Sequence, residues 1–190
     1  YFGRQLGAMD AAYPALLGGL DDQTAQRLGE GYIALLESRG LRVDASTNKR
    51  PDNFLYLGLI KALFPNVRIL HTARNPLDTC LSIFFQPLAD ELSYANDIKH
   101  VGHYYLQYRR LMNFWAEQYP DSILHIPYEG LVQNPKAVIE PALHFLGLEW
   151  DDACLNFYEV ENRVRTASVA QVRQPLYQTS AGRAGNYAKY

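Results

Sequence analysis

The residues with the clearest capacity for chemistry lie in the segment RILHTARNPLDTCLS, residues 68–82. An apolar run ends at Arg74, and the next two residues, Asn75 and Pro76, are the types preferred at the N-cap and first position of a helix. A helix N-terminus offers free N–H groups and a partial positive charge, and Arg74 adds a fork-shaped cation at the same point. Ser82 lies close to two helical turns beyond the cap, so its hydroxyl returns to the face of the strand end. These residue types at this spacing predict an anion site that suits a phosphate.

The same segment has a second interpretation, which its residues do not exclude. Arg74 would pair with a neighbouring carboxylate, and Ser82 would only fill a position in the helix. Asp78 falls at the third helical position, from which a carboxylate can bond back to the N-cap residue. The residues favour the phosphate site but leave this alternative open.

The elements expected to position these residues alternate between strands and helices, which is typical of βαβ units with a parallel sheet covered on both sides. Ligands bind at the carboxyl ends of the strands in such sheets, which is where Arg74 stands. His71 falls inside a buried strand and is expected to be a satisfied core histidine. Strands are expected at residues 41–45, 67–73 and 122–128, and helices at 10–38 (one or two), 53–64, 76–85, 98–119 and 135–146.

The composition is that of a soluble globular protein, with 48% hydrophobic and 20% charged residues. We expect a single domain spanning residues 1–190, large enough to bury a core. No apolar run approaches the roughly 18 residues of a membrane span, and no signal peptide pattern opens the chain. Cys80 and Cys154 stand alone, without the spacing of a metal or redox site, and predict a reducing, cytoplasmic location.

The net charge of −2 conceals a basic tail. Residues 162–190 carry five basic side chains and no acidic one, whereas acidic side chains predominate in the rest of the chain. A basic tail on an acidic body indicates that the tail meets an anion. A solvated tail that binds nothing is the alternative on charge alone.

Four segments in sequence order resemble the PAPS-dependent sulfotransferases, which use 3'-phosphoadenylyl sulfate. They are TNKRPDNFLYLGLIKALFPNVRILHTARNPLDTCLS, LHIPYEGLVQNP, HFLGLEWDDACL and RTASVAQVRQPLY. Together they reach from residue 47 to about residue 183 and look most like tyrosylprotein sulfotransferases and their bacterial relatives, often fused to tetratricopeptide repeats. The resemblance implies the C-terminal part of a catalytic domain with a P-loop nucleotide-triphosphate-hydrolase-like α/β fold, in which helices flank a parallel sheet. It also implies sulfuryl transfer from PAPS to a hydroxyl acceptor, with adenosine 3',5'-bisphosphate (PAP) as product and no metal.

Carried over residue by residue, the resemblance assigns a nucleotide-binding role to part of the second half of the chain. Arg74 and Ser82 match the 3'-phosphate motif of the family, an arginine at a strand end with a serine eight residues later. Tyr128 matches the residue that contacts the adenine, and its aromatic face and hydroxyl suit a purine, with core packing as the alternative. Further cofactor contacts are expected at Val169, Arg173 and Arg183.

Two residues match catalytic positions of the family. Lys49 corresponds to the lysine that approaches the transferring sulfuryl group, and Ser168 to the serine that stabilises the same transition state. Sulfuryl transfer, like phosphoryl transfer, places charge on equatorial oxygens and on the departing oxygen, so cationic and hydroxyl donors are the groups it needs. Without the resemblance, Lys49 would be taken for a surface lysine.

The sequence departs from the family in two places. No loop of the P-loop-like type that cradles the 5'-phosphosulfate occurs in it, and we expect this loop and the glutamate general base upstream of Tyr1. The 190-residue chain alone is therefore expected to be inactive. The tail reads Gly-Arg-Ala-Gly at residues 182–185 where the bacterial relatives tend to carry Gly-Arg-Trp, so an aromatic lid is not expected there.

Two other functions remain as alternatives. One is a non-catalytic nucleotide-binding module derived from a sulfotransferase. The other is a P-loop kinase-like phosphotransferase, which would need a Walker-type loop and a Mg²⁺-binding carboxylate near a strand end. The expected partner is a hydroxyl-bearing acceptor (a peptide, a carbohydrate or a small molecule), with no nucleic acid and no membrane span. The sequence leaves open which acceptor is used and whether the chain forms a homodimer.

Overall fold

The computed structural model describes residues 13–40, 46–86, 90–159, 174–177, 179–187 and 189. The chain divides into two compact units, Tyr1–Val67 and Arg68–Tyr190. The strand expected at residues 41–45 lies outside the described residues. The single domain expected from the length stays a prediction.

The first unit is helical in its described part. Its elements are η1 (Ala15–Gly19), α2 (Asp22–Ser38), η2 (Asn53–Tyr56) and α3 (Leu57–Leu63). Helix α2 begins where it does because the carboxylate of Asp21 accepts the N–H of Thr24 at 2.7 Å, an N-cap bond. The helices predicted within residues 10–38 and 53–64 are therefore present.

Helices α2 and α3 pack through a small apolar core. Its buried members are Ala25 and Leu28 from α2 and Leu59 and Leu63 from α3. Gly29 allows the close approach, since a Cβ placed on it would lie 2.9 Å from the carbonyl oxygen of Leu63. A larger residue at this position would force the two helices apart.

The second unit contains a parallel pair of strands, β1 (Ile69–Ala73) and β2 (Ile123–Pro127). The register pairs Ile69 with Ile123 and Ala73 with Pro127. The connection runs through α4 (Pro76–Phe84), η3 (Asp90–Asn96) and α5 (Ile98–Gln118), the long crossover that parallel strands require. The described part of this unit is thus α/β and mostly helical, with a small parallel sheet.

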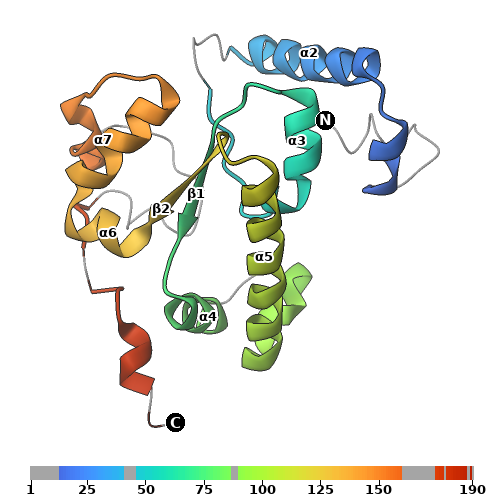
Figure 1. The fold of residues 1–190 in the computed structure, drawn as a ribbon. Helices are drawn as coiled ribbons and strands as arrows, with labels where there is room; N and C mark the ends of the chain where they lie inside the picture. The colour runs from blue at the N-terminus through green and yellow to red at the C-terminus, as the bar shows by residue number, and fades with distance from the viewer. Residues whose placement is uncertain are drawn as a thin grey trace. The chain divides into compact units, whose positions relative to one another are not determined.

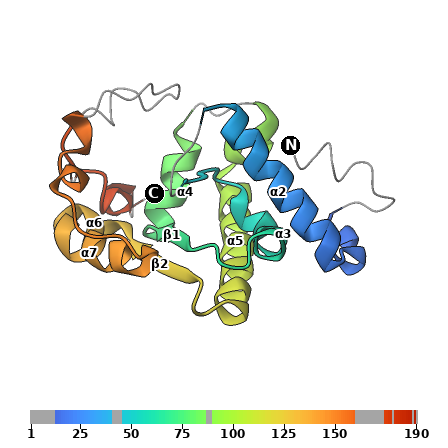
Figure 2. The same ribbon diagram turned by 90° about the horizontal axis from the view of Figure 1, so that it is seen from above.

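Helices lie on both sides of this strand pair. Helix α5 lies on one side, and α6 (Tyr128–Gln133) and α7 (Pro135–Leu146) lie on the other (Figures 1 and 2). Side chains alternate along a strand, so the buried Ile126 faces opposite to its neighbour His125. The layered α/β arrangement that the alternating elements predict is confirmed for these strands.

Residue types at the helix ends explain where these helices start and stop. Asp97 caps α5 by accepting the N–H groups of Lys99 and His100, and α7 begins with the cap Asn134. Helix α7 ends at Gly147, whose φ of 72° is the left-handed conformation that favours glycine. No helix in the described ranges is long and apolar enough to cross a membrane.

Candidate functional site

The carboxyl ends of β1 and β2 bring Arg74 and Tyr128 together. Each residue directly follows a strand, and the last residues of the strands, Ala73 and Pro127, are partners in the register. The guanidinium carbon of Arg74 lies 5.2 Å from the centre of the Tyr128 ring, a cation–π contact. Two residues 54 positions apart in the sequence are therefore neighbours because the strands are parallel and in register.

The start of α4 is tied to the end of β2. The side chain of Asn75 caps the helix by accepting the N–H groups of Leu77 at 3.0 Å and Asp78 at 3.2 Å, as predicted. The N–H of Asn75 itself donates to Oε1 of Glu129 at 2.8 Å. The prediction that Asp78 bonds back to the cap is wrong, because Glu129 takes that place.

The carboxylate of Asp78 is instead bound by the C-terminal tail. Its Oδ2 accepts the N–H of Gly182 at 2.6 Å, and its Oδ1 accepts the N–H of Ala184 at 2.7 Å. The residue is 1% exposed, and Oδ2 lies 3.7 Å from Nη2 of Arg74. A buried carboxylate is costly unless it is paired and hydrogen-bonded, and here both conditions are met.

Arg74 has an unused donor. Its Nη2 donates to the carbonyl oxygen of Ser180 and forms the ion pair with Asp78. Its Nε is buried and, within the described ranges, is the one buried side-chain nitrogen or oxygen without a hydrogen-bond partner. The pairing with a carboxylate that the sequence left open is therefore present, and Nε is left without a hydrogen-bond partner among the described residues.

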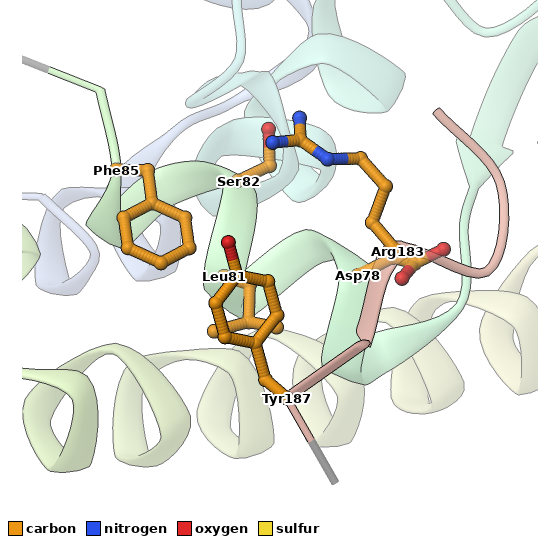
Figure 3. Close-up of a pocket in the computed structure, with 6 residues that line it drawn as sticks. All are labelled: Asp78, Leu81, Ser82, Phe85, Arg183 and Tyr187. Atoms are coloured by element: carbon orange, nitrogen blue, oxygen red, sulfur yellow. The ribbon is translucent and has the colours of Figure 1, made fainter. Parts of the chain in front are cut away.

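Ser82 and Arg183 line one small hollow on α4, shown in Figure 3. The guanidinium of Arg183 extends toward the hydroxyl of Ser82, with Asp78 at the base of the arginine (Figure 3). The hollow has room for one water molecule, about 10 Å³. Its other lining residues are Leu81, Phe85 and Tyr187.

The remaining predicted site residues are not brought to this place by the described structure. Lys49 lies in the first unit, with an exposed side chain. Ser168, Val169 and Arg173 lie outside the described residues. The nucleotide-binding roles of Arg74, Ser82, Tyr128 and Arg183 stay predictions. Arg74 and Tyr128 lie at the N-terminal end of α4, whereas Ser82 and Arg183 line the hollow farther along the helix.

Comparison with known proteins places the chain in a family. Residues 9–152 match the sulfotransferase family. The chain belongs to the sulfotransferase family. An uncharacterized protein of Aquifex aeolicus (strain VF5) is 31% identical over 191 residues, which cover 97% of this chain and 25% of that protein. The chain thus spans about a quarter of the length of that relative.

Membership of the family agrees with the coarser expectations from the sequence. The family implies a P-loop-like fold, and the parallel strands with a helical crossover in this chain fit it. The similarity to tyrosylprotein enzymes and the fusion to tetratricopeptide repeats stay predictions.

A second polar cluster joins β1 and β2 to α5. Nδ1 of His71 lies 2.7 Å from Nδ1 of His125, and Nε2 of His71 is hydrogen-bonded to the hydroxyl of Tyr108. Burial lowers the pKa of His71 to about 4, with further contributions from His125 and Arg109. Burial also raises the pKa of Tyr108. His71 is hydrogen-bonded as expected, but the prediction that it lies in a buried core strand is wrong, because the ring is half-buried and no residue of β1 is fully buried.

The free energy of unfolding of the protein is expected to fall as the pH drops from about 6.5 to about 4. The folded state keeps His71 neutral in this window, whereas the unfolded chain protonates it near pH 6.5, so the stabilisation is complete above 6.5 and is lost toward 4. Because His71 is partly exposed, solvent screening reduces the loss in the free energy of unfolding to about 1–2 kcal/mol. Urea unfolding at pH 7.0 and 4.5 measures it.

Two variants isolate the contribution of His71 to this pH dependence. His71→Phe removes the titrating group and should reduce the difference in stability between the two pH values. His103→Phe, at an exposed position of α5, should leave the difference in stability between the two pH values unchanged. An unchanged pH dependence in His71→Phe would contradict the assignment.

Proposed function

We propose that this chain is part of a PAPS-dependent sulfotransferase that passes a sulfuryl group to a hydroxyl acceptor. The observation that carries the proposal is the unused, buried Nε donor of Arg74 at the N-terminal end of α4. Membership of the sulfotransferase family supports it. Arginine presents its donors in a rigid fork that suits phosphate, and a helix N-terminus adds to the local positive potential.

The residues around α4 carry the chemical groups that a 3'-phosphate and its nucleotide would need. Arg74 and Arg183 supply positive charge, Ser82 supplies a hydroxyl, and Tyr128 offers an aromatic face to the adenine. The hollow between Ser82 and Arg183 holds about one water, so the side chains that line it must move to admit a phosphate. The ion pair with Arg74 and the two backbone N–H bonds offset the charge of Asp78, which would otherwise repel the anion.

The catalytic part of the proposal rests on Lys49 and Ser168. PAPS, when bound, supplies an activated sulfuryl group. Lys49 places a compact, movable charge beside the oxygen that becomes negative in the transition state, and the hydroxyl of Ser168 donates a hydrogen bond to the same oxygen. Val169 and Arg173 are proposed as nucleotide contacts, and the proposed acceptor is a peptide, a carbohydrate or a small molecule that carries a hydroxyl.

Calorimetry on the full-length protein, with PAP and with Mg²⁺–ATP as ligands, tests the proposed function. PAP is expected to bind at least about tenfold more tightly, since a 3'-phosphate contact to arginine is worth about 1.5–3 kcal/mol. ATP that binds as well as PAP would favour a phosphotransferase instead. PAP binding without PAPS turnover on a panel of hydroxyl acceptors would favour a non-catalytic nucleotide-binding module.

A further inference from the structure

The C-terminal segment, defined here as residues 179–187, contacts α4 near both ends of that helix. At the N-terminal end of α4, Asp78 holds the N–H groups of Gly182 and Ala184. At the other end, the ring of Tyr187 packs against Phe85, with the ring centres 5.4 Å apart. The segment therefore lies along α4, and its polar contacts are two hydrogen bonds to the buried carboxylate of Asp78 and one from Nη2 of Arg74 to the carbonyl oxygen of Ser180.

Asp78 fixes the backbone on both sides of Arg183. Its two oxygens are taken by the N–H groups of residues 182 and 184, which flank the arginine directly. The φ of 77° at Gly182 makes the turn that points these groups at one carboxylate. Because hydrogen bonds hold the backbone at residues 182 and 184, only the side chain of Arg183 can rotate freely. That side chain extends toward Ser82 (Figure 3).

We propose that Asp78 is a positioning residue of the nucleotide site, which anchors the C-terminal segment and thereby holds Arg183 beside Ser82. This inference rests on the proposed function for its consequence, but not for the anchoring itself. A carboxylate in direct contact with a phosphate would repel it. The role of Asp78 is therefore to place a cation rather than to bind the ligand.

Hydrogen exchange measured by mass spectrometry on the full-length protein tests the anchoring. Asp78→Asn keeps the shape of the side chain but replaces one acceptor oxygen with an NH₂ group, which cannot accept an N–H. The amides of residues 182 and 184 are expected to exchange at least about tenfold faster in this variant. Asp97→Asn is the matched control, because Asp97 also accepts two backbone N–H groups, those of Lys99 and His100, but within α5.

A double-mutant cycle tests the consequence for the nucleotide site. Arg183→Ala is expected to weaken PAP binding about tenfold when Asp78 is present, as for a hydrogen bond to a charged group. In the Asp78→Asn background the same change should cost less than about twofold, because the arginine is no longer held in place. If Asp78 had a purely structural role, Arg183→Ala would reduce PAP affinity by the same factor in both backgrounds. The Asp97→Asn background should retain the tenfold cost.

Each outcome decides a separate part of the inference. Unchanged exchange at residues 182 and 184 overturns the anchoring. Faster exchange with an undiminished cost of Arg183→Ala overturns the positioning role. Absence of PAP binding by the unmodified protein overturns the proposed function and the nucleotide role, while the exchange result still decides the anchoring.

A second variant covers the case in which Asp78→Asn fails to fold. Ala184→Pro deletes one of the two N–H donors from the exposed side of the contact, because proline has no N–H. It leaves the buried carboxylate in place. In Ala184→Pro we again expect faster exchange at residue 182. In this background Arg183→Ala should weaken PAP binding less than about twofold.

Discussion

Replacing Arg74 with alanine is expected to weaken PAP binding by the full-length protein by about 2–3 kcal/mol, or about 30- to 150-fold. The guanidinium stands where β1 ends and α4 begins, and its buried Nε has no partner among the described residues. Its removal also leaves the carboxylate of Asp78 without its ion pair. Both effects reduce the affinity of the site for an anion, and calorimetry with PAP measures their sum.

Two further variants show whether the position or only the charge matters. Arg74→Lys keeps the positive charge but loses the forked guanidinium. Its affinity for PAP should lie between those of the wild-type protein and Arg74→Ala. Arg68→Ala removes an arginine that precedes the other end of β1, where it donates to the carbonyl oxygen of Asp121 at 2.7 Å. PAP affinity should be unchanged in that control. Unchanged affinity in Arg74→Ala would remove this residue from the nucleotide site.

Replacing Lys49 with alanine is expected to lower kcat about 100- to 1,000-fold while PAP affinity stays within about twofold. The lysine is exposed, so its loss should not disturb the core. A charge that acts on the departing oxygen matters mainly in the transition state, which is why turnover should fall without weaker nucleotide binding. Steady-state assays with PAPS and calorimetry with PAP on the full-length protein separate the two quantities.

Arg50→Ala provides the matched control for Lys49. It removes the adjacent exposed cation, which is paired with Asp52 at 3.0 Å, and should change kcat less than about threefold. An equal loss of turnover and PAP affinity in Lys49→Ala would show that the lysine binds the nucleotide rather than acting in the transition state. A normal kcat would exclude it from catalysis.

The sequence predicted the described elements of the second unit wherever local residue types specify them. The strands expected at 67–73 and 122–128 and the helix expected at 98–119 agree with β1, β2 and α5 to within about two residues, because caps and prolines mark their ends. Helix α6 was not predicted. It follows β2 without a break and has six residues, too few for a helical pattern to emerge.

The candidate site was foreseen only in part. The rule that ligands bind at strand ends pointed to Arg74, and the parallel register explains why Tyr128 joins it. The contact of Asp78 with the tail could not be foreseen, because it spans 104 and 106 residues. Its donors are main-chain N–H groups, which every residue except proline carries.

Main-chain recognition also determines how freely this tail can change over evolution. Because Asp78 binds the N–H groups at positions 182 and 184 rather than their side chains, most substitutions in the tail leave the contact intact. The exceptions are proline at either position and a bulky residue at 182, where φ is 77°. Two homologous tails with few letters in common can therefore dock in the same way, and alignment of their side chains would understate the relationship.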